Sequence, residues 1–271
     1  MSAIENLQNY WGLTRVPFGP DIPADRLVPT RGHAEAVARI RWAISGRQIC
    51  VIAGEVGAGK TAAARAALAG IEPARHIPIY IPDPTIGLKG IHAVIVTALG
   101  GQPHYANATL AIQAARHLGV ERDERGRTPI LIIDEAHLLA NQELEGLRLL
   151  TNTSMDTGAD FALILLGQPT LRRRLKLGVL TALDQRIATR YTIEGMNRDE
   201  TSLYIKTHLA WAGRTDTLFS DDAINEIWQT SRGYPRAVNT LATASMLAAY
   251  TDQKAVIDRS SAEKATAENT E

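Results

Sequence analysis

Eight consecutive residues, GEVGAGKT at positions 54–61, constrain the fold of this chain more than any other stretch. They match the pattern GxxxxGK[ST], follow a short apolar run and precede an alanine-rich segment. In this pattern the glycines let backbone N–H groups close around phosphate oxygens, and the N-terminus of the following helix adds partial positive charge. The pattern predicts a phosphate-binding loop between a buried strand and a helix.

The loop positions have expected roles toward a nucleotide. Lys60 is expected to reach the β and γ phosphates, and the Thr61 hydroxyl is expected to bind Mg²⁺. ATP and Mg²⁺ are therefore the expected cofactors. The residues expected to contact the nucleotide are Gly54, Glu55, Val56, Gly57, Ala58, Gly59, Lys60 and Thr61.

An acidic pair, Asp134 and Glu135, follows the apolar run 129–133. Asp134 would hold Mg²⁺ through water or through Thr61, and Glu135 is placed to polarise the attacking water. This acidic pair predicts that the chain hydrolyses the bound ATP. The letters DEAH also name a helicase motif, but the rest of the sequence has no second RecA-like half and no arginine-rich helicase motif.

Three further polar residues are candidates for catalysis. Gln168 follows the apolar run 161–166 and is expected to sense the γ-phosphate and orient water, although Gln before Pro is also an ordinary turn residue. Arg186 precedes the last predicted strand, and Arg236 opens a late helix. Either arginine can complement γ-phosphate charge, Arg186 on a neighbour's nucleotide and Arg236 on its own, but by spacing alone both are also ordinary surface residues.

Five short apolar runs alternate with helical stretches rich in alanine and leucine. They cover residues 48–53, 77–81, 129–133, 161–166 and 189–193. Short strands that are apolar on both faces and alternate with helices indicate a parallel sheet between two helical layers.

The strand patterns stop after residue 193, and residues 197–258 are predicted to form three helices. Asn197 with Glu200, Ser220 and Pro235 mark the starts of these helices. The expected organisation is an N-terminal arm, an α/β core, a small helical domain and a flexible tail, with the bounds 1–29, 30–195, 196–258 and 259–271.

Charge and composition exclude several classes of protein. Lys+Arg and Asp+Glu both number 29, so a strongly basic nucleic-acid coat is excluded and any DNA contact must be local. No window approaches a membrane span and no signal peptide is visible, so a cytoplasmic protein without membrane contact is expected. The single cysteine, Cys50, excludes an internal disulfide and is expected to be buried, and the seven histidines show no metal-ligand spacing.

Together these motifs resemble those of AAA+ ATPases, with Walker A at 54–61, Walker B at 130–135, sensor 1 at Gln168, an arginine finger at Arg186 and sensor 2 at Arg236. Within that superfamily the chain is similar to the ExeA-like branch over about residues 10–250. The shared segments are YWGLTRVPFGPDIPADRL, IAGEVGAGKT, LIIDEAHLL, LLGQPTLRRRL and GYPRAVNTLA. The resemblance implies an α/β fold, namely a P-loop AAA+ three-layer sandwich with a parallel five-stranded sheet and a small C-terminal helical lid.

Two functions are known for the proteins that this chain resembles. Secretion-type members continue into a membrane span and a cell-wall-binding domain, which this chain is expected to lack. Transposition-type members, similar to MuB, TnsC and TniB, are short ATPases that load on target DNA and recruit or activate a transposase. The PFGPDIPAD opening and the short architecture resemble the second group more.

The resemblance implies an ATP-bound homo-oligomer, a ring or a helical filament, on double-stranded DNA. Arg186 would complete the neighbouring subunit's site, a transposase would be the partner, and hydrolysis would release the assembly. The alternatives are a secretion or membrane-assembly ATPase and a nucleotide-gated scaffold that barely hydrolyses ATP.

Relatives contact DNA through loops that face a central channel, which points here to residues 84–90. Lys89 is the candidate phosphate contact, although a lysine on a loop can also be merely solvated. The densest basic cluster can contact DNA, a transposase or a neighbouring subunit, or form a solvated helix face. It consists of Arg172, Arg173, Arg174 and Lys176.

Overall fold

The computed structural model describes residues 3–19, 22–23, 26–152 and 158–270. The expected N-terminal arm and tail therefore each include residues outside the description, namely 1–2, 20–21, 24–25 and 271. The chain divides into two compact units. The α/β unit comprises Ala34–Val56 and Lys60–Ile193, and the helical unit comprises Met1–His33, Gly57–Gly59 and Glu194–Glu271.

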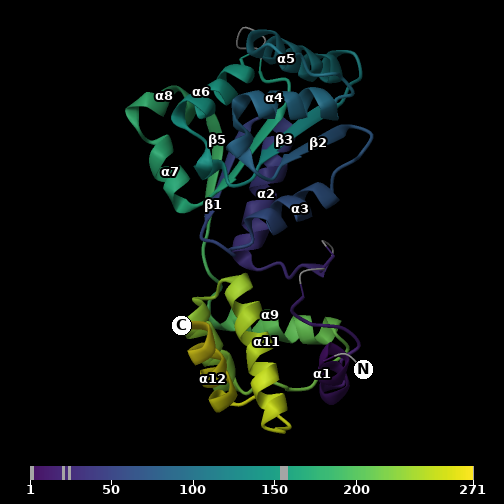
Figure 1. Cartoon of the computed structure of the whole chain (residues 1–271), viewed down its shortest axis with the longest axis vertical. Helices are drawn as coiled ribbons and strands as arrows, with labels where there is room; N and C mark the ends of the chain where they lie inside the picture. Colours follow the sequence, from purple (N-terminus) through teal and green to yellow (C-terminus); the bar gives the residue numbers. More distant parts are fainter. Residues whose placement is uncertain (1–2, 20–21, 24–25, 153–157, 271) are drawn as a thin grey trace. The chain divides into compact units, whose positions relative to one another are not determined.

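A five-stranded sheet forms the centre of the α/β unit (Figure 1). All its neighbouring strands are parallel, in the order β2-β3-β4-β1-β5. The interior strands β4 and β1 are buried along their whole length, as strands covered on both faces must be. The strands are β1 (Ile49–Gly54), β2 (His76–Ile81), β3 (Thr128–Ile133), β4 (Ala162–Gly167) and β5 (Ile187–Ile193).

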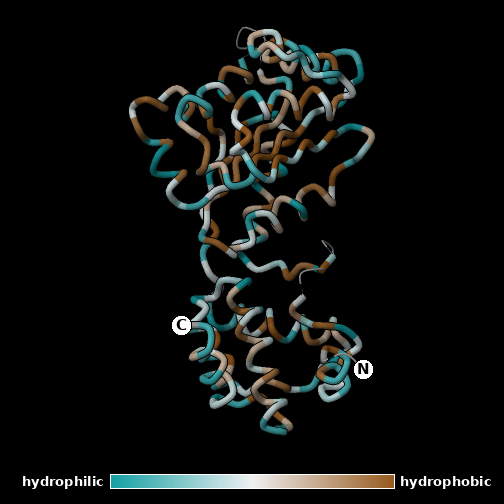
Figure 2. The backbone as a smooth tube through the Cα atoms, in the orientation of Figure 1, coloured by the Kyte–Doolittle hydropathy of each residue, from teal (hydrophilic) through white to brown (hydrophobic). Residues whose placement is uncertain are grey.

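Helices cover both faces of this sheet, which confirms the predicted fold class. Figure 2 shows the hydrophobic tube concentrated in the strands between them. One face packs against α4 (Gly87–Ala98), α5 (Asn107–Asp123), α6 (Asn141–Leu150), α7 (Pro169–Leu175) and α8 (Thr181–Arg186). The other face is covered by α2 (Arg31–Gly46) and α3 (Lys60–Ala69).

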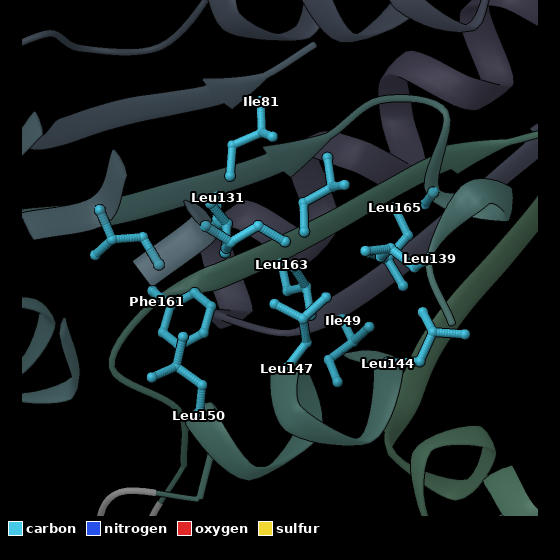
Figure 3. Close-up of a cluster of buried hydrophobic side chains, with 14 of the residues drawn as sticks. Ile49, Ile81, Leu131, Leu139, Leu144, Leu147, Leu150, Phe161, Leu163 and Leu165 are labelled. Carbon is cyan, nitrogen blue, oxygen red and sulfur yellow. The ribbon is translucent and has the colours of Figure 1, made fainter. Parts of the chain in front are cut away.

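The core under α6 illustrates the two-residue period of the strands. Leu144, Leu147 and Leu150 of α6 meet side chains from the sheet in Figure 3. Leu163 and Leu165 of β4 both point into this core, because alternate side chains of a strand share one face. Burying a leucine stabilises a fold by about 2 kcal/mol, so this cluster holds the sheet and its helices together.

The three helices predicted after residue 193 are present in the helical unit as α9 (Arg198–Trp211), α10 (Asp221–Ser231) and α11 (Pro235–Thr251). Asn197 and Glu200 form a reciprocal capping box, in which each backbone N–H donates to the other side chain at 3.0 and 2.8 Å. Ser220 Oγ accepts from the Ala223 N–H at 3.1 Å. Across the described residues, none of the helices is long and apolar enough to cross a bilayer.

The segment expected to be a flexible tail is instead a helix, α12 (Arg259–Thr270). Asp258 Oδ1 caps it by accepting from the Ser261 N–H at 3.0 Å. Ala262 and Ala265 are fully buried, and α12 contacts α10 and α11. The sequence does not predict this helix, because its buried face consists of small residues and shows no apolar residues at helical spacing.

The N-terminal segment is part of the helical unit's core. It contains α1 (Ala3–Trp11), and Trp11 at its end is 1% exposed. Phe18 packs in the same cluster as residues of α9, α10, α11 and α12. His208 Nδ1 lies 2.8 Å from the Pro17 carbonyl oxygen, and burial lowers the pKa of this imidazole. The described residues before α2 and the helices α9 to α12 therefore share one hydrophobic core.

Candidate nucleotide site

The predicted phosphate loop joins the end of β1 to the start of α3. Gly57 and Gly59 have φ angles of 78° and 91°, a backbone region that only glycine adopts without strain. Lys60, the first residue of α3, is 6% exposed. Its Nζ donates to the carbonyl oxygens of Gly54 and Glu55 at 2.9 and 3.0 Å. The loop is therefore folded around the ammonium group that is expected to bind phosphate.

Asp134 is the most highly bonded acid near this loop. Its Oδ2 accepts from the Thr61 hydroxyl at 2.7 Å and from the Tyr80 hydroxyl at 3.0 Å. Its Oδ1 accepts from the Glu135 N–H at 2.9 Å. The residue is only 5% exposed, so these three donors offset much of the cost of burying a carboxylate. The arrangement fixes an oxygen-rich point beside the phosphate loop.

Tyr80, in β2, is a functional candidate that no sequence motif marks. Burial raises the pKa of its hydroxyl to about 12, and the Asp134 carboxylate adds to this by repelling a phenolate. The hydroxyl is thus neutral at ordinary pH and remains a donor to Asp134. Nothing in the sequence near Tyr80 indicated the contact, because it depends on the pairing of β2 with β3.

Glu135 has a left-handed backbone, with φ 48° and ψ 33°, which is uncommon for a residue other than glycine. It precedes the short 3-10 helix η3 (Ala136–Leu138), and its side chain is 44% exposed. The Nδ1 of His137 lies 3.2 Å from Glu135 Oε2. The carboxylate therefore faces accessible space, as a group that acts on water must, while its backbone is held by the turn.

The strand order brings the predicted residues of three loops to one edge of the sheet. β3, β4 and β1 are neighbours, and the carboxyl ends of parallel strands meet at the same edge, where ligands of open α/β sheets bind. Glu135 follows β3, Gln168 follows β4 and the phosphate loop follows β1. A Cβ at Gly167 would lie 3.3 Å from the His137 backbone nitrogen, so glycine lets η3 pass close to the end of β4.

Arg186 lies at the opposite edge of the sheet. It is the last residue of α8 and directly precedes β5, so it stands at the amino ends of the strands. Its guanidinium donates to Thr151 Oγ1 at 3.3 Å and to Asn152 Oδ1 at 2.9 Å. Arg186 is therefore separated from its own phosphate loop by the length of the sheet.

Arg236 contacts the phosphate loop, and Lys89 follows β2. Arg236 is the second residue of α11, directly after Pro235, and its backbone N–H donates to the Gly57 carbonyl oxygen at 3.3 Å, a contact within the helical unit. Lys89 is not on a loop, as the sequence analysis expected, but in the first turn of α4, because Asp83 caps the turn η2 (Pro84–Ile86) and the chain then enters the helix. Its Nζ lies 4.5 Å from the centre of the Tyr105 ring, and both side chains are exposed.

The basic cluster on and after α7 is divided by its contacts. The Arg174 guanidinium donates to the carbonyl oxygens of His137 and Leu139 at 2.7 and 2.6 Å, and to Asn141 Oδ1 at 2.8 Å. Arg173 and Lys176 are exposed. The cluster is therefore not one solvated face, since Arg174 is bound to the segment that follows Glu135.

The oxygen donors at this edge suit a hard cation. Thr61 and Asp134 offer a hydroxyl and a carboxylate side by side, the ligand types that Mg²⁺ prefers. Within the described ranges, no group of three or more His, Cys, Asp or Glu side chains could hold a metal ion without further ligands. Such a donor set fits an ion that binds together with a nucleotide, because Mg²⁺ usually combines few carboxylates with substrate phosphates.

Comparison with known proteins finds one matching family and one similar curated protein. Residues 41–175 match the family model described as AAA domain. The chain is 29% identical over 245 residues to General secretion pathway protein A of Aeromonas hydrophila, covering 89% of this chain and 44% of that protein. The chain thus spans less than half the length of this curated relative.

Several solved structures share the fold. Cdc6p of Pyrobaculum aerophilum matches with a TM-score of 0.68 and 16% identity, over 89% of this chain and 67% of that chain. The Orc1 protein of Aeropyrum pernix in complex with DNA matches with a TM-score of 0.66 and 16% identity, over 93% and 68%. The RuvB Holliday junction branch migration motor of Thermotoga maritima matches with a TM-score of 0.55 and 16% identity, over 86% and 67%.

Proposed function

We propose that this chain, which carries an AAA domain over residues 41–175, is an ATPase that assembles on double-stranded DNA and regulates a transposase. The observation that carries the ATPase part is the hydrogen bond between Thr61 and Asp134 beside the buried Lys60. It joins a hydroxyl and a carboxylate directly beside the phosphate loop. Phosphoryl transfer is catalysed mainly by such positioned charges.

Each residue at the sheet edge has a proposed part in hydrolysis. Lys60 binds the β and γ phosphates, and Thr61 and Asp134 hold Mg²⁺, which neutralises developing charge on the phosphate oxygens when it is bound. Glu135 orients the attacking water and accepts its proton. Gln168 senses the γ-phosphate from the neighbouring strand end. The loop residues that contact the nucleotide are Gly54, Glu55, Val56, Gly57, Ala58 and Gly59.

The position of Arg186 supports hydrolysis in an oligomer. Because it stands at the sheet edge opposite its own phosphate loop, we propose that it completes the site of a neighbouring subunit in a ring or helical filament. Arg236 of the helical unit is proposed to act on the nucleotide of its own chain. An arginine supplied by a neighbour makes turnover depend on assembly.

The DNA part of the proposal is supported by the motifs and by the fold. The PFGPDIPAD opening and the short architecture resemble the short transposition ATPases, and a solved structure with the same fold is described in complex with DNA. With a net charge of zero, a monomer has few cations to place on phosphates, whereas an assembly multiplies those contacts. Lys89 is the proposed phosphate contact, and hydrolysis is proposed to release the assembly after a transposase has been recruited.

A second function is favoured by one comparison. The 29% identity to General secretion pathway protein A covers 89% of this chain, which supports an ATPase that serves secretion or the assembly of a membrane complex. A secretion ATPase has no reason to respond to DNA, so the two functions differ in one measurable property.

Electron microscopy with a slowly hydrolysed ATP analogue distinguishes them. We expect rings or filaments that need both the analogue and duplex DNA, and turnover of ATP that rises when DNA is added. Lys89→Ala should weaken assembly on DNA and leave ATP affinity unchanged. Particles that bind nucleotide but ignore DNA would contradict the transposition proposal and favour the secretion function. If the chain binds ATP but does not hydrolyse it, with or without DNA, the result would favour a nucleotide-gated scaffold over both ATPases.

A further inference from the structure

We propose that Arg174 is a positioning residue that holds Glu135 in its working orientation and links it to Gln168. The inference rests on the proposed ATPase function and adds a residue to it. Arg174 is half-buried and donates three hydrogen bonds, all to the segment 137–141 that follows the acidic pair. Hydrogen bonds from a charged group are about twice as strong as neutral ones, so this segment is held firmly.

The bonds of Arg174 complete the turn after Glu135. Within the turn, the Glu135 carbonyl accepts from the Leu138 N–H at 2.8 Å and the Ala136 carbonyl accepts from the Leu139 N–H at 3.3 Å. The carbonyls of His137 and Leu139 come after these and need donors from elsewhere, as the last carbonyls of any helix do. Arg174 supplies both.

Holding this turn also fixes Glu135 itself. A left-handed backbone at a glutamate costs free energy and persists only where its surroundings enforce it. The 3-10 turn after Glu135 has only three residues, so a shift at 137 moves the residue directly before the turn. His137, whose Nδ1 lies 3.2 Å from the Glu135 carboxylate, is the residue whose carbonyl Arg174 binds.

Arg174 belongs to the same helix that Gln168 begins. α7 has seven residues and is anchored by the buried Leu171 and Leu175, so it moves as one piece. A displacement of Gln168 on contact with the γ-phosphate is then transmitted to Arg174, and through its three bonds to the turn at Glu135. The sensor and the catalytic glutamate would respond together to the same phosphate.

The first test compares Arg174→Met with Arg39→Met. Arg39 is a matched control because it is also half-buried and fastens a helix to backbone, donating to the Arg190 carbonyl at 2.9 Å, without touching the segment after Glu135. For Arg174→Met we expect kcat to fall at least about tenfold with the Kd of a fluorescent ATP analogue unchanged, since small misplacements of catalytic groups cost that much. Arg39→Met should lower Tm by a similar amount and keep kcat. Arg174→Lys should restore kcat only in part, because an ammonium lacks the guanidinium fork.

A double variant separates positioning from general damage. In the Glu135→Gln background, Arg174→Met should cause no further loss of the residual turnover, because the group that Arg174 positions is already gone. A full additional loss in that background, wild-type kcat in Arg174→Met, or equal losses of kcat in Arg174→Met and Arg39→Met would each overturn the proposal.

Hydrogen exchange keeps this inference distinct from the proposed function. We expect the amides of residues 136–141 to exchange faster in Arg174→Met than in the wild-type chain, a readout that needs no turnover. If the wild-type chain hydrolyses no ATP, the proposed function fails, and the exchange rates still decide whether Arg174 holds the turn. If the exchange rates of these amides are the same in both proteins, Arg174 does not hold the turn.

Discussion

The Thr61 hydroxyl donates to Asp134 Oδ2 at 2.7 Å, although 73 positions separate the two residues in the chain. The bond joins the first turn of α3 to the end of β3. It exists because the strand order places β1 and β3 on either side of β4. A hydroxyl and a carboxylate that the sequence carries far apart thus become neighbours beside the phosphate loop.

This pair predicts how nucleotide affinity depends on Mg²⁺. Thr61→Ala removes one of the two protein oxygens proposed to hold the ion, so the gain in ATP affinity on adding Mg²⁺ should shrink at least about tenfold, the typical effect of losing a metal-site contact. Titration of a fluorescent ATP analogue with and without Mg²⁺ measures it. Thr61→Ser keeps the hydroxyl and should behave like the wild-type chain. An unchanged Mg²⁺ effect in Thr61→Ala would remove Thr61 from the site.

Replacing Glu135 by glutamine should trap the proposed assembly on DNA. The amide keeps the shape of the side chain but cannot take a proton from water, so ATP stays bound and hydrolysis-driven release stops. Sedimentation or electron microscopy after addition of ATP should show persistent complexes with DNA, while those of the wild-type chain disperse. Glu72→Gln, at an exposed ion pair with Arg75, serves as the control. Complexes of Glu135→Gln that disperse at the wild-type rate would show that Glu135 is not the base.

Arg186→Ala should separate binding from turnover. Its position at the far edge of the sheet predicts an unchanged Kd for ATP and a loss of about a hundredfold or more in turnover at concentrations where the chain assembles, as for other arginines that complete a phosphoryl-transfer site. Turnover measured across a range of protein concentrations tests this. The variant should match the wild-type chain when both are dilute monomers. An equal loss at every concentration would mean that Arg186 does not act on a neighbour.

Asp258 makes the stability of the helical unit depend on pH. The Lys254 ammonium, 2.9 Å away, holds the pKa of this carboxyl well below its ordinary value, and the bonds from Ser261 contribute in the same direction. A depressed pKa in the folded state stabilises the fold above the ordinary pKa of aspartate, and this stabilisation is lost as the pH falls below it. Asp258→Ala should cost about 1 kcal/mol at pH 7, as the loss of a helix cap does.

Denaturant unfolding at several pH values checks this expectation. The difference between Asp258→Ala and the wild-type chain should be largest at neutral pH and shrink on acidification through the range where free aspartate titrates. Asp221→Ala is a suitable comparison, since Asp221 is an acid in the first turn of α10, directly after Ser220, which supplies the cap of that helix. A difference that stays constant down to pH 3 would show that the Asp258 charge does not stabilise α12.

Local patterns in the sequence were sufficient for the sheet and the phosphate loop. The apolar runs predicted all five strands to within a few residues, because strands buried on both faces contain little but apolar side chains. The glycines at 57 and 59 were predicted from the motif and have the left-handed φ angles that a phosphate loop needs. Where one residue type can serve only one geometry, the sequence was informative.

Other features depend on the three-dimensional arrangement and could not be predicted in this way. Arg172, Arg173 and Arg174 are identical letters in a row, and only the path of η3 beside α7 distinguishes the one that binds the turn after Glu135. The sequence gives no sign of α12, because alanine and serine fill a tight interface without an apolar pattern. The apolar pattern places Lys89 on a loop, whereas the cap at Asp83 starts helical structure earlier in the chain.

The shared core of the N-terminal segment and the last helices also determines an order of events during translation. All five strands of the α/β unit have been synthesised once the ribosome passes residue 193, so this unit can fold while the rest of the chain is still emerging. Trp11 and Phe18 must wait for α12 before their apolar surface is covered. A nascent chain would thus complete its sheet before the core around Trp11 and Phe18, whose apolar surface stays exposed until α12 has been synthesised.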